Sequence, residues 1–280
     1  MYILSPADVP SFRKKYSPIV IDARGGPDAY SRYVAQHLEG AQFVDLETQL
    51  SQKTQNPARG GRHPLPDLKT LSQLLGKLGI TPGVHVLIYD DKAGANAAAR
   101  FWWMLKTIGH KHIQVVSGGL DAMIKAGIPV TTVIPPGVSV DPYPIHTNEL
   151  PVVDVSIVMD AVKNPDALVI DVREAYRYRG ESEPIDLIAG HIPGAINVPF
   201  VTNLGSDGQF LPTEQLLEKY KDVIGSRDPQ NVIVHCGSGV TACHTLLAME
   251  EAGIPDAKLY VGSWSEWSRN DYPIATGENP

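Results

Sequence analysis

Short runs of apolar, mostly β-branched residues recur along the chain, and segments with helical spacing separate them. Such runs are typical of buried parallel strands. We expect strands at residues 19–21, 84–89, 113–116, 168–170, 232–235 and 258–261, and helices from Ser5 onward and at 68–78, 97–107 and 213–224. Strands that alternate with helices predict an α/β fold with a parallel sheet. Ligands of such sheets bind at the carboxyl ends of the strands.

The same pattern occurs twice in the chain. Three segments of the first half return in the second half in the same order. The matching pairs are 20–24 (VIDAR) with 169–173 (VIDVR), 37–41 (HLEGA) with 191–195 (HIPGA), and 86–90 (VLIYD) with 232–236 (VIVHC). Repetition of this kind predicts two domains that are related by duplication.

A proline-rich segment lies between the two copies. Residues 133–144 contain four prolines and one glycine, which exclude a helix or a central strand and favour an extended, stiff linker. We therefore expect a first domain at residues 1–132, a linker at 133–150 and a second domain at 151–280.

One cysteine lies where a central strand of the second copy is expected to end. Cys236 follows the apolar run 232–235 and precedes a loop of small residues that leads into a helix. The backbone amides of such a loop and the helix N-terminus stabilise negative charge, so they favour the reactive thiolate. The residues of this expected anion cradle are Gly237, Gly239, Val240 and Thr241. A buried cysteine that merely closes the strand is the alternative, and the Gly-Ser-Gly bend favours the cradle.

The first copy has a carboxylate at the position of the thiol. Alignment of the two copies places Asp90 opposite Cys236. A carboxylate cannot perform thiol chemistry, and it repels an anion. The first domain is therefore predicted to be catalytically silent, with one active site per chain in the second domain.

Composition and charge narrow the class of protein. The chain has 280 residues, of which 43% are hydrophobic and 20% charged, as in a soluble globular enzyme. The net charge of −7 argues against nucleic acid or a membrane surface as partners. We expect no signal peptide and no membrane span. Two cysteines make no disulfide framework, which favours the cytoplasm, and we expect no metal site or organic cofactor.

These motifs give the whole chain a resemblance to the tandem-domain rhodaneses, a family that includes thiosulfate and 3-mercaptopyruvate sulfurtransferases. The matching segments are 236–242 (CGSGVTA), 261–267 (VGSWSEW), 190–195 (GHIPGA) and the two Ile-Asp-x-Arg segments. An aspartate in place of the first-domain cysteine is also usual in the family. The resemblance implies two tandem rhodanese-like domains, each a parallel β-sheet flanked by helices.

The resemblance also implies a reaction. The Cys236 thiolate attacks the sulfane sulfur of a small anionic donor, thiosulfate or 3-mercaptopyruvate, and becomes a persulfide. A thiophilic acceptor then removes the outer sulfur. Cyanide is the acceptor in the assay, and thioredoxin or another thiol is the expected acceptor in a cell.

The identity of the donor stays open. Arg177 matches the family's substrate-binding arginine, which would grip a carboxylate or sulfonate. The loop resembles that of mercaptopyruvate enzymes, since thiosulfate enzymes commonly have basic residues where this chain has Gly237 and Ser238. Mercaptopyruvate enzymes, however, usually carry a second arginine shortly after a Glu-Pro step, and residues 183–186 (EPID) contain none.

The family also suggests a polar relay beside the thiol. Its members place a serine of the loop near a histidine and a carboxylate of the first domain. Here Ser238, His63 and Glu47 occupy the matching stretches. The alternative for His63 is exposure to solvent, because it lies in a loop rich in glycine, arginine and proline.

Several other polar residues are expected to serve the fold. Arg24 and Arg173 each follow Ile-Asp at a strand end, and because the silent copy has the motif too, we expect Asp–Arg pairs that fasten the strands. Because the silent copy contains His37 at the position that matches His191, we expect both histidines to have structural roles. The remaining expectations are a helix cap for Thr241, core positions for Trp264 and Trp267, and a buried helix position for Cys243 rather than a resolving role.

Two other functions compete with sulfur transfer. A cysteine-dependent phosphatase needs an arginine six positions after the cysteine, and residue 242 is alanine. A non-catalytic sulfur carrier or interaction module is the second alternative. The nucleophile together with Arg177 argues against a role in binding alone.

Overall fold

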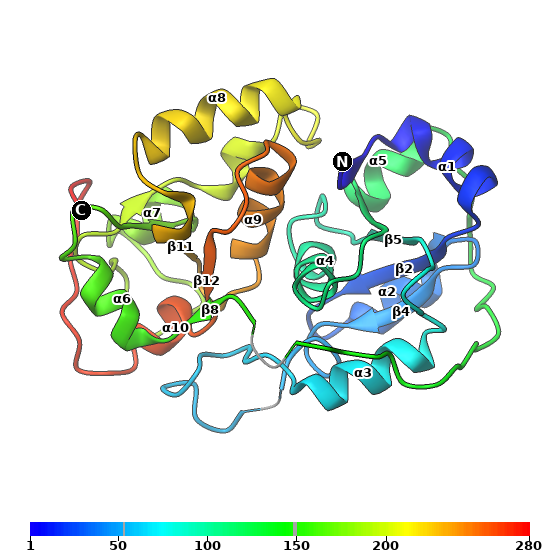
Figure 1. Cartoon of the computed structure of the whole chain (residues 1–280), viewed down its shortest axis with the longest axis horizontal. Coiled ribbons are helices and arrows are strands. Elements are labelled where there is room, and N and C mark those ends of the chain that lie inside the picture. Colours follow the sequence, from blue (N-terminus) through cyan, green and yellow to red (C-terminus); the bar gives the residue numbers. More distant parts are fainter. Residues whose placement is uncertain (53, 148–149) are drawn as a thin grey trace. The chain divides into compact units, whose positions relative to one another are not determined.

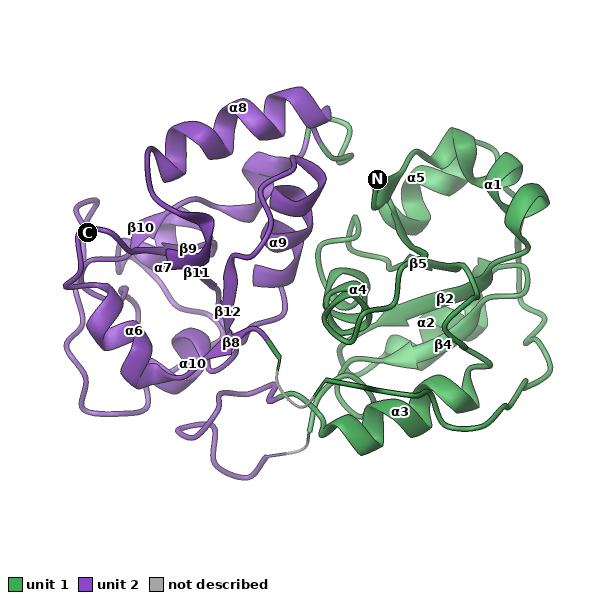
Figure 2. Ribbon diagram, viewed as in Figure 1, with its two compact units in different colours: residues 1–52, 65–150, 205–210 green, residues 53–64, 151–204, 211–280 purple. Residues whose placement is uncertain are grey.

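The computed structural model describes residues 1–52, 54–147 and 150–280. They form two compact units (Figure 2). Unit 1 comprises residues 1–52, 65–150 and 205–210, and unit 2 comprises residues 53–64, 151–204 and 211–280. A short segment of each sequence half thus belongs to the unit built mainly from the other half.

Unit 1 is built on a parallel sheet with helices packed around it (Figure 1). Its strand order is β1-β6-β5-β2-β4. The strands are β1 (Ile3–Leu4), β2 (Ile19–Arg24), β4 (Gln42–Asp45), β5 (Val86–Tyr89) and β6 (Ile113–Val116). The helices are α1 (Val9–Tyr16), α2 (Ala29–Ala35), α3 (Leu68–Lys77), α4 (Ala97–Thr107) and α5 (Gly119–Lys125), with a 3₁₀ turn at Pro6–Asp8. A small antiparallel ribbon joins β3 (His37–Leu38) to β7 (Val130–Thr131).

Unit 2 repeats this architecture. Its parallel sheet has the order β10-β9-β11-β12-β8. The strands are β8 (Val152–Val153), β9 (Leu168–Asp171), β10 (Ile196–Asn197), β11 (Val232–His235) and β12 (Lys258–Tyr260). The helices are α6 (Val155–Ala161), α7 (Ala175–Tyr178), α8 (Thr213–Ile224), α9 (Ala242–Glu251) and α10 (Ser263–Trp267), with 3₁₀ turns at Phe200–Asn203 and Pro229–Asn231.

The two sheets have the same topology, which confirms the predicted α/β fold and its duplication. Read from the opposite edge, unit 2 follows the order β8-β12-β11-β9-β10, and each strand corresponds in sequence order to a strand of unit 1. The expected strands at 113–116 and 232–235 and the helices at 97–107 and 213–224 agree with β6, β11, α4 and α8 in both bounds.

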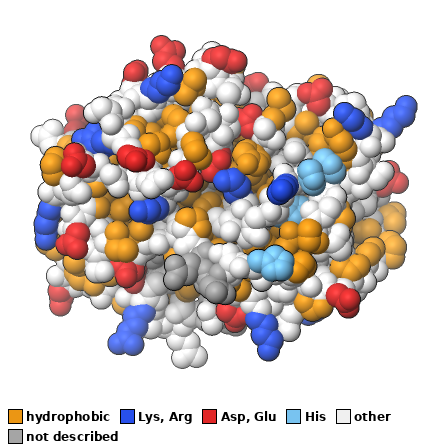
Figure 3. Space-filling model, viewed as in Figure 1, with side chains coloured by type: hydrophobic (Ala, Val, Ile, Leu, Met, Phe, Trp, Pro, Cys, Tyr) orange, Lys and Arg blue, Asp and Glu red, His pale blue; other side chains and the backbone are white. Residues whose placement is uncertain are grey.

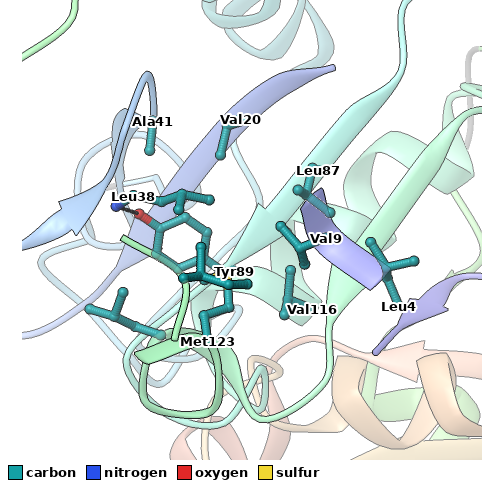
Figure 4. Close-up of a cluster of buried hydrophobic side chains, with 11 residues drawn as sticks. Leu4, Val9, Val20, Leu38, Ala41, Leu87, Tyr89, Val116 and Met123 are labelled. Carbon is teal, nitrogen blue, oxygen red and sulfur yellow. Dashed lines mark hydrogen bonds between the residues drawn. The ribbon is translucent and has the colours of Figure 1, made fainter. Parts of the chain in front are cut away.

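Apolar side chains fill the space between sheet and helices in each unit. In unit 1 the core includes Leu87 and Val116 from the strands, and Tyr89 reaches across it to accept a 2.8 Å hydrogen bond from the Leu38 amide (Figure 4). In unit 2 the core includes Trp264 and Trp267, both buried. The expectation that these tryptophans are core residues is confirmed.

The strand-end arginines pair with the carboxylates two residues before them. Arg24 Nε lies 2.6 Å from Asp22 Oδ1, and Arg173 Nη2 lies 2.7 Å from Asp171 Oδ2. All four side chains are buried. The predicted Asp–Arg fasteners are therefore confirmed in both units.

The duplicated histidines are also structural. The ring of His37 stacks on Tyr33 and its Nδ1 lies 2.7 Å from the Tyr33 carbonyl. His191 makes the same pair of contacts with Tyr178, with a 2.8 Å hydrogen bond. Both histidines are buried, as the presence of His37 in the silent copy predicted.

The segment expected to be a linker packs against α3. The Val140 amide donates to the Gly76 carbonyl and the Tyr143 amide to the Ser72 carbonyl. Residues 148 and 149 of that segment lie outside the described residues.

No helix in the described part of the chain combines the length and apolar character needed to cross a membrane. Figure 3 shows acidic and basic side chains interspersed on the face that it draws.

Candidate active site

Cys236 lies at the carboxyl end of β11, the middle strand of the unit 2 sheet. The backbone bends through residues 237–240, and α9 begins at Ala242. Cys236 is 3% exposed. A buried thiol that precedes a helix N-terminus lies where backbone dipoles favour an anion.

The N-terminus of α10 holds the loop in place. The Trp264 amide donates to the Cys236 carbonyl at 3.0 Å, and the Ser265 amide donates to the Gly237 carbonyl at 2.8 Å. The Cys236 amide in turn donates to Ser263 Oγ at 3.2 Å. The segment 261–267, noted in the sequence, thus forms the support that fixes the backbone on either side of the thiol.

Gly239 is required by the shape of the loop. Its φ of +71° lies in the left-handed region, which costs other residues about 1–2 kcal/mol. A Cβ atom there would lie 2.7 Å from the Val261 carbonyl oxygen, at the end of β12. The loop can therefore approach its support this closely only with glycine at this position.

The counterpart of this loop in unit 1 encloses a carboxylate. Asp90 is fully buried at the end of β5, and its oxygens accept hydrogen bonds from four backbone amides. These amides belong to Lys92 (2.8 Å), Gly94 (2.7 Å), Asn96 (3.0 Å) and Ala98 (3.2 Å). Burial raises the pKa of Asp90, and the four amides act in the opposite direction because they favour the carboxylate. The loop of unit 1 is thus folded around an internal carboxyl group, with four backbone amides directed at its oxygens.

A histidine approaches the loop of unit 2. A 2.7 Å hydrogen bond joins His63 Nδ1 to Ser238 Oγ. The segment that carries His63 is held on α10, since the Gly60 amide donates to Glu266 Oε1 and the Arg62 amide to Ser265 Oγ. His63 is therefore a hydrogen-bonded neighbour of the loop. Glu47 belongs to unit 1, and its part in a relay stays a prediction.

Arg177 is buried and paired with carboxylates of its own unit. Its Nη2 lies 2.8 Å from Glu183 Oε1, its Nη1 lies 3.3 Å from Glu174 Oε2, and Asp186 Oδ2 is 3.4 Å from Nη2. Burial alone would raise the pKa of Glu183, but hydrogen bonds from Arg177 and from the amides of Asp186 and Ile185 lower it. Both partners are therefore charged at neutral pH.

The cluster around Asp186 was not predicted from the sequence. Asp186 contacts Arg62, Arg177 and Arg269, which come from three separate segments of unit 2. A Cβ atom on Gly237 would lie 3.2 Å from Arg62 Nη2 and 3.3 Å from Asp186 Oδ2. The cluster therefore touches the residue that follows the thiol. The absence of arginine at 183–186 was the available signal, but it did not reveal what Asp186 contacts.

Three further residues, Thr241, His235 and Cys243, lie in or next to the loop. The expectation that the Thr241 side chain caps α9 is wrong, because Thr241 has helical backbone angles and makes no side-chain capping bond. His235, which precedes the thiol, is fully buried, and burial lowers its pKa, so the ring is neutral at pH 7. Cys243 is buried on α9 and its Sγ donates to the Gly239 carbonyl, as expected for a structural helix residue.

Fold and site together define a duplicated α/β protein with one thiol at the end of the middle strand of its second sheet. The family model described as Rhodanese-like domain matches residues 5–126 and 154–270. The chain therefore belongs to the rhodanese family and is a sulfurtransferase.

Some relatives of this chain are named for 3-mercaptopyruvate and others for thiosulfate. The chain is 40% identical over 251 residues to the Pseudomonas aeruginosa protein named "Probable 3-mercaptopyruvate sulfurtransferase", covering 88% of this chain and 86% of that one. It is 34% identical over 262 residues to the thiosulfate sulfurtransferase of Rattus norvegicus, covering 92% and 84%. The solved structure of 3-mercaptopyruvate sulfurtransferase from Leishmania major is similar with a TM-score of 0.82 and 29% identity, covering 95% of this chain and 74% of that one.

Proposed function

We propose that this chain moves a sulfur atom, either the thiol sulfur of 3-mercaptopyruvate or the sulfane sulfur of thiosulfate, to a thiophilic acceptor through a persulfide on Cys236. The observation that carries the proposal is the correspondence between the two loops. In unit 1 the loop binds the Asp90 carboxylate through four amides, and in unit 2 the equivalent side chain is the Cys236 thiol. A loop suited to an anion favours the thiolate and then the persulfide anion.

The first half-reaction forms the persulfide. The Cys236 thiolate attacks the outer sulfur of thiosulfate, the S–S bond of the donor breaks, and sulfite leaves with the bonding electron pair. With 3-mercaptopyruvate the C–S bond breaks instead, and the electron pair goes to carbon to give the enolate of pyruvate. The enolate then takes up a proton and becomes pyruvate. In both cases Cys236 holds one additional sulfur.

The second half-reaction regenerates the thiolate. Cyanide attacks the outer sulfur of the persulfide, the S–S bond breaks, and thiocyanate leaves while Cys236 recovers its electron pair. A thiol such as that of thioredoxin reacts in the same way and carries the sulfur as its own persulfide. This chemistry requires a reduced Cys236, which supports a reducing compartment such as the cytoplasm.

Ser238 and His63 form the proton pathway of this proposal. The enolate of pyruvate needs a proton, whereas sulfite leaves as a stable anion. Ser238 follows Cys236 by two residues and its hydroxyl is hydrogen bonded to the His63 ring. The pair supplies a proton next to the leaving group, which is general acid catalysis.

Steady-state kinetics with cyanide as acceptor test the proposal. The native protein is expected to form thiocyanate from at least one of the two donors, and Cys236→Ser is expected to form none. The matched control is Cys243→Ser, which removes the buried thiol of α9 and is expected to keep turnover. Turnover that survives in folded Cys236→Ser would contradict the proposal.

A further inference from the structure

Asp186 places an internal carboxylate among three guanidinium groups beside the nucleophile. Arg62 Nε lies 2.9 Å from Asp186 Oδ1, Arg269 Nη1 lies 3.2 Å from the same oxygen, and Arg177 Nη2 lies 3.4 Å from Oδ2. The Asp186 side chain is 0% exposed. Three arginines around one carboxylate form the kind of site that binds an anionic group with directed hydrogen bonds.

This site adjoins the loop of the thiol. A Cβ atom on Gly237 would meet Arg62 Nη2 at 3.2 Å, Asp186 Oδ2 at 3.3 Å and Arg177 Nη2 at 3.4 Å. The Asp186 carboxylate therefore lies against the residue that follows Cys236. An anionic donor that offers its sulfur to Cys236 must place its charged group close to that point, because the donors of the proposed reaction are only a few atoms long.

The acidic residues Glu183 and Asp186 are held differently. Glu183 binds Arg177, accepts hydrogen bonds from the Ile185 and Asp186 amides, and contacts Arg173. It is therefore anchored from several sides. Asp186 depends more on Arg62 and Arg269, whose side chains are 24% and 23% exposed. Water and small anions can reach these two arginines, so the Asp186 carboxylate is the group that an incoming anion can replace.

We propose that Asp186 is a specificity-determining residue that occupies the anion site of the donor and must be displaced from it. This inference rests on the proposed function of sulfur transfer. A displaced Asp186 stays near the site and repels the bound donor. The repulsion is stronger for thiosulfate, which carries two negative charges, than for 3-mercaptopyruvate, which carries one. Asp186 therefore selects against thiosulfate.

Asp186→Asn tests the selection through the Michaelis constants of the two donors. The KM for thiosulfate is expected to fall about tenfold, the scale of one partly screened charge–charge interaction, and the KM for 3-mercaptopyruvate is expected to fall by about threefold at most. The matched control is Glu181→Gln, which removes a negative charge from an exposed position of the same segment and should change neither KM. If Asp186→Asn left both KM values unchanged, or lowered both by the same factor, the inference would be overturned.

A second measurement does not depend on the folding of that variant. The crystal structure of Cys236→Ser with thiosulfate is expected to show the anion on Arg62, with the Asp186 carboxylate withdrawn from the arginines. Asp186 still held by all three arginines, with thiosulfate elsewhere or absent, would overturn the inference. Loss of the proposed function would look different, because the native protein would then form no thiocyanate from either donor.

Discussion

At the residue scale, the site depends on two glycines for different reasons. Gly239 supplies a left-handed backbone conformation under the Val261 carbonyl, whereas Gly237 leaves room for Arg62 and Asp186. A side chain at either position would change the approach to Cys236. The small residues of the loop thus determine its shape and its neighbours at once.

The Gly239→Ala variant separates strain from steric conflict. Alanine at a positive φ costs about 1–2 kcal/mol, and the added Cβ would also lie 2.7 Å from a carbonyl oxygen. We expect a loss of unfolding free energy clearly above about 2 kcal/mol, together with loss of turnover. Gly253→Ala is the control, since Gly253 has a φ of +75° and a Cβ atom added there would have no neighbour within 4 Å. Equal losses in urea denaturation of the two variants would contradict this account of Gly239.

Ser238→Ala distinguishes the two donors at the chemical step. If Ser238 helps to protonate the pyruvate enolate, its removal should lower kcat with 3-mercaptopyruvate by about a hundredfold, the usual range for general acid catalysis. The kcat with thiosulfate should stay within about threefold, because sulfite needs no proton to leave. Steady-state kinetics with both donors on one preparation provide the comparison. A parallel loss with both donors would show that Ser238 acts on the loop rather than on a proton.

At the element scale, the ends of neighbouring strands position both the nucleophile and a buried Asp–Arg ion pair. β11 ends at the nucleophile, and the neighbouring β9 ends at Asp171, whose carboxylate pairs with Arg173. Burial by itself would raise the pKa of Asp171, but the charge and hydrogen bonds of Arg173 hold it below its ordinary value. The pair thus fixes the backbone of the strand next to the thiol.

Asp171→Asn should therefore destabilise the protein in a pH-dependent way. A folded-state pKa below the unfolded value of about 4 contributes stability that is present above pH 4 and lost as the pH falls through the folded value. We expect a loss of about 3 kcal/mol at pH 7, because Arg173 loses a buried partner, and a smaller loss below pH 4. Urea denaturation across this range measures it, with the exposed Asp222→Asn on α8 as the control. A difference that grows towards acid pH would contradict the assignment.

The sequence predicted the inner elements better than the outer ones. The strands at 113–116 and 232–235 could be predicted because inner strands of a parallel sheet are covered on both faces and therefore appear in the sequence as mostly apolar runs. The edge strands β1, β8 and β10 have two residues each, too few to show a period, and they were missed, as was the four-residue edge strand β4. Similarly, the loop after Cys236 is contiguous and could be predicted. The partners of Asp186 come from segments up to 124 residues away, which no local pattern encodes.

At the scale of the whole molecule, the two units share one fold and differ at the end of the middle strand. Both units keep the sheet order, the Asp–Arg fasteners and the stacked His–Tyr pairs. They differ at the end of the middle strand, where unit 1 has Asp90 enclosed by amides and unit 2 has Cys236. The features that the units share are structural, and the proposed chemistry depends on Cys236, which unit 1 lacks.

The most direct test of this account is the mass of the chain after treatment with donor and removal of excess reagent. Intact-protein and peptide mass spectrometry should show one addition of about 32 Da, one sulfur atom, on Cys236 and none on Cys243. Cyanide should remove the addition. An unmodified Cys236 after treatment with both donors, or a sulfur carried only by Cys243, would contradict the central claim.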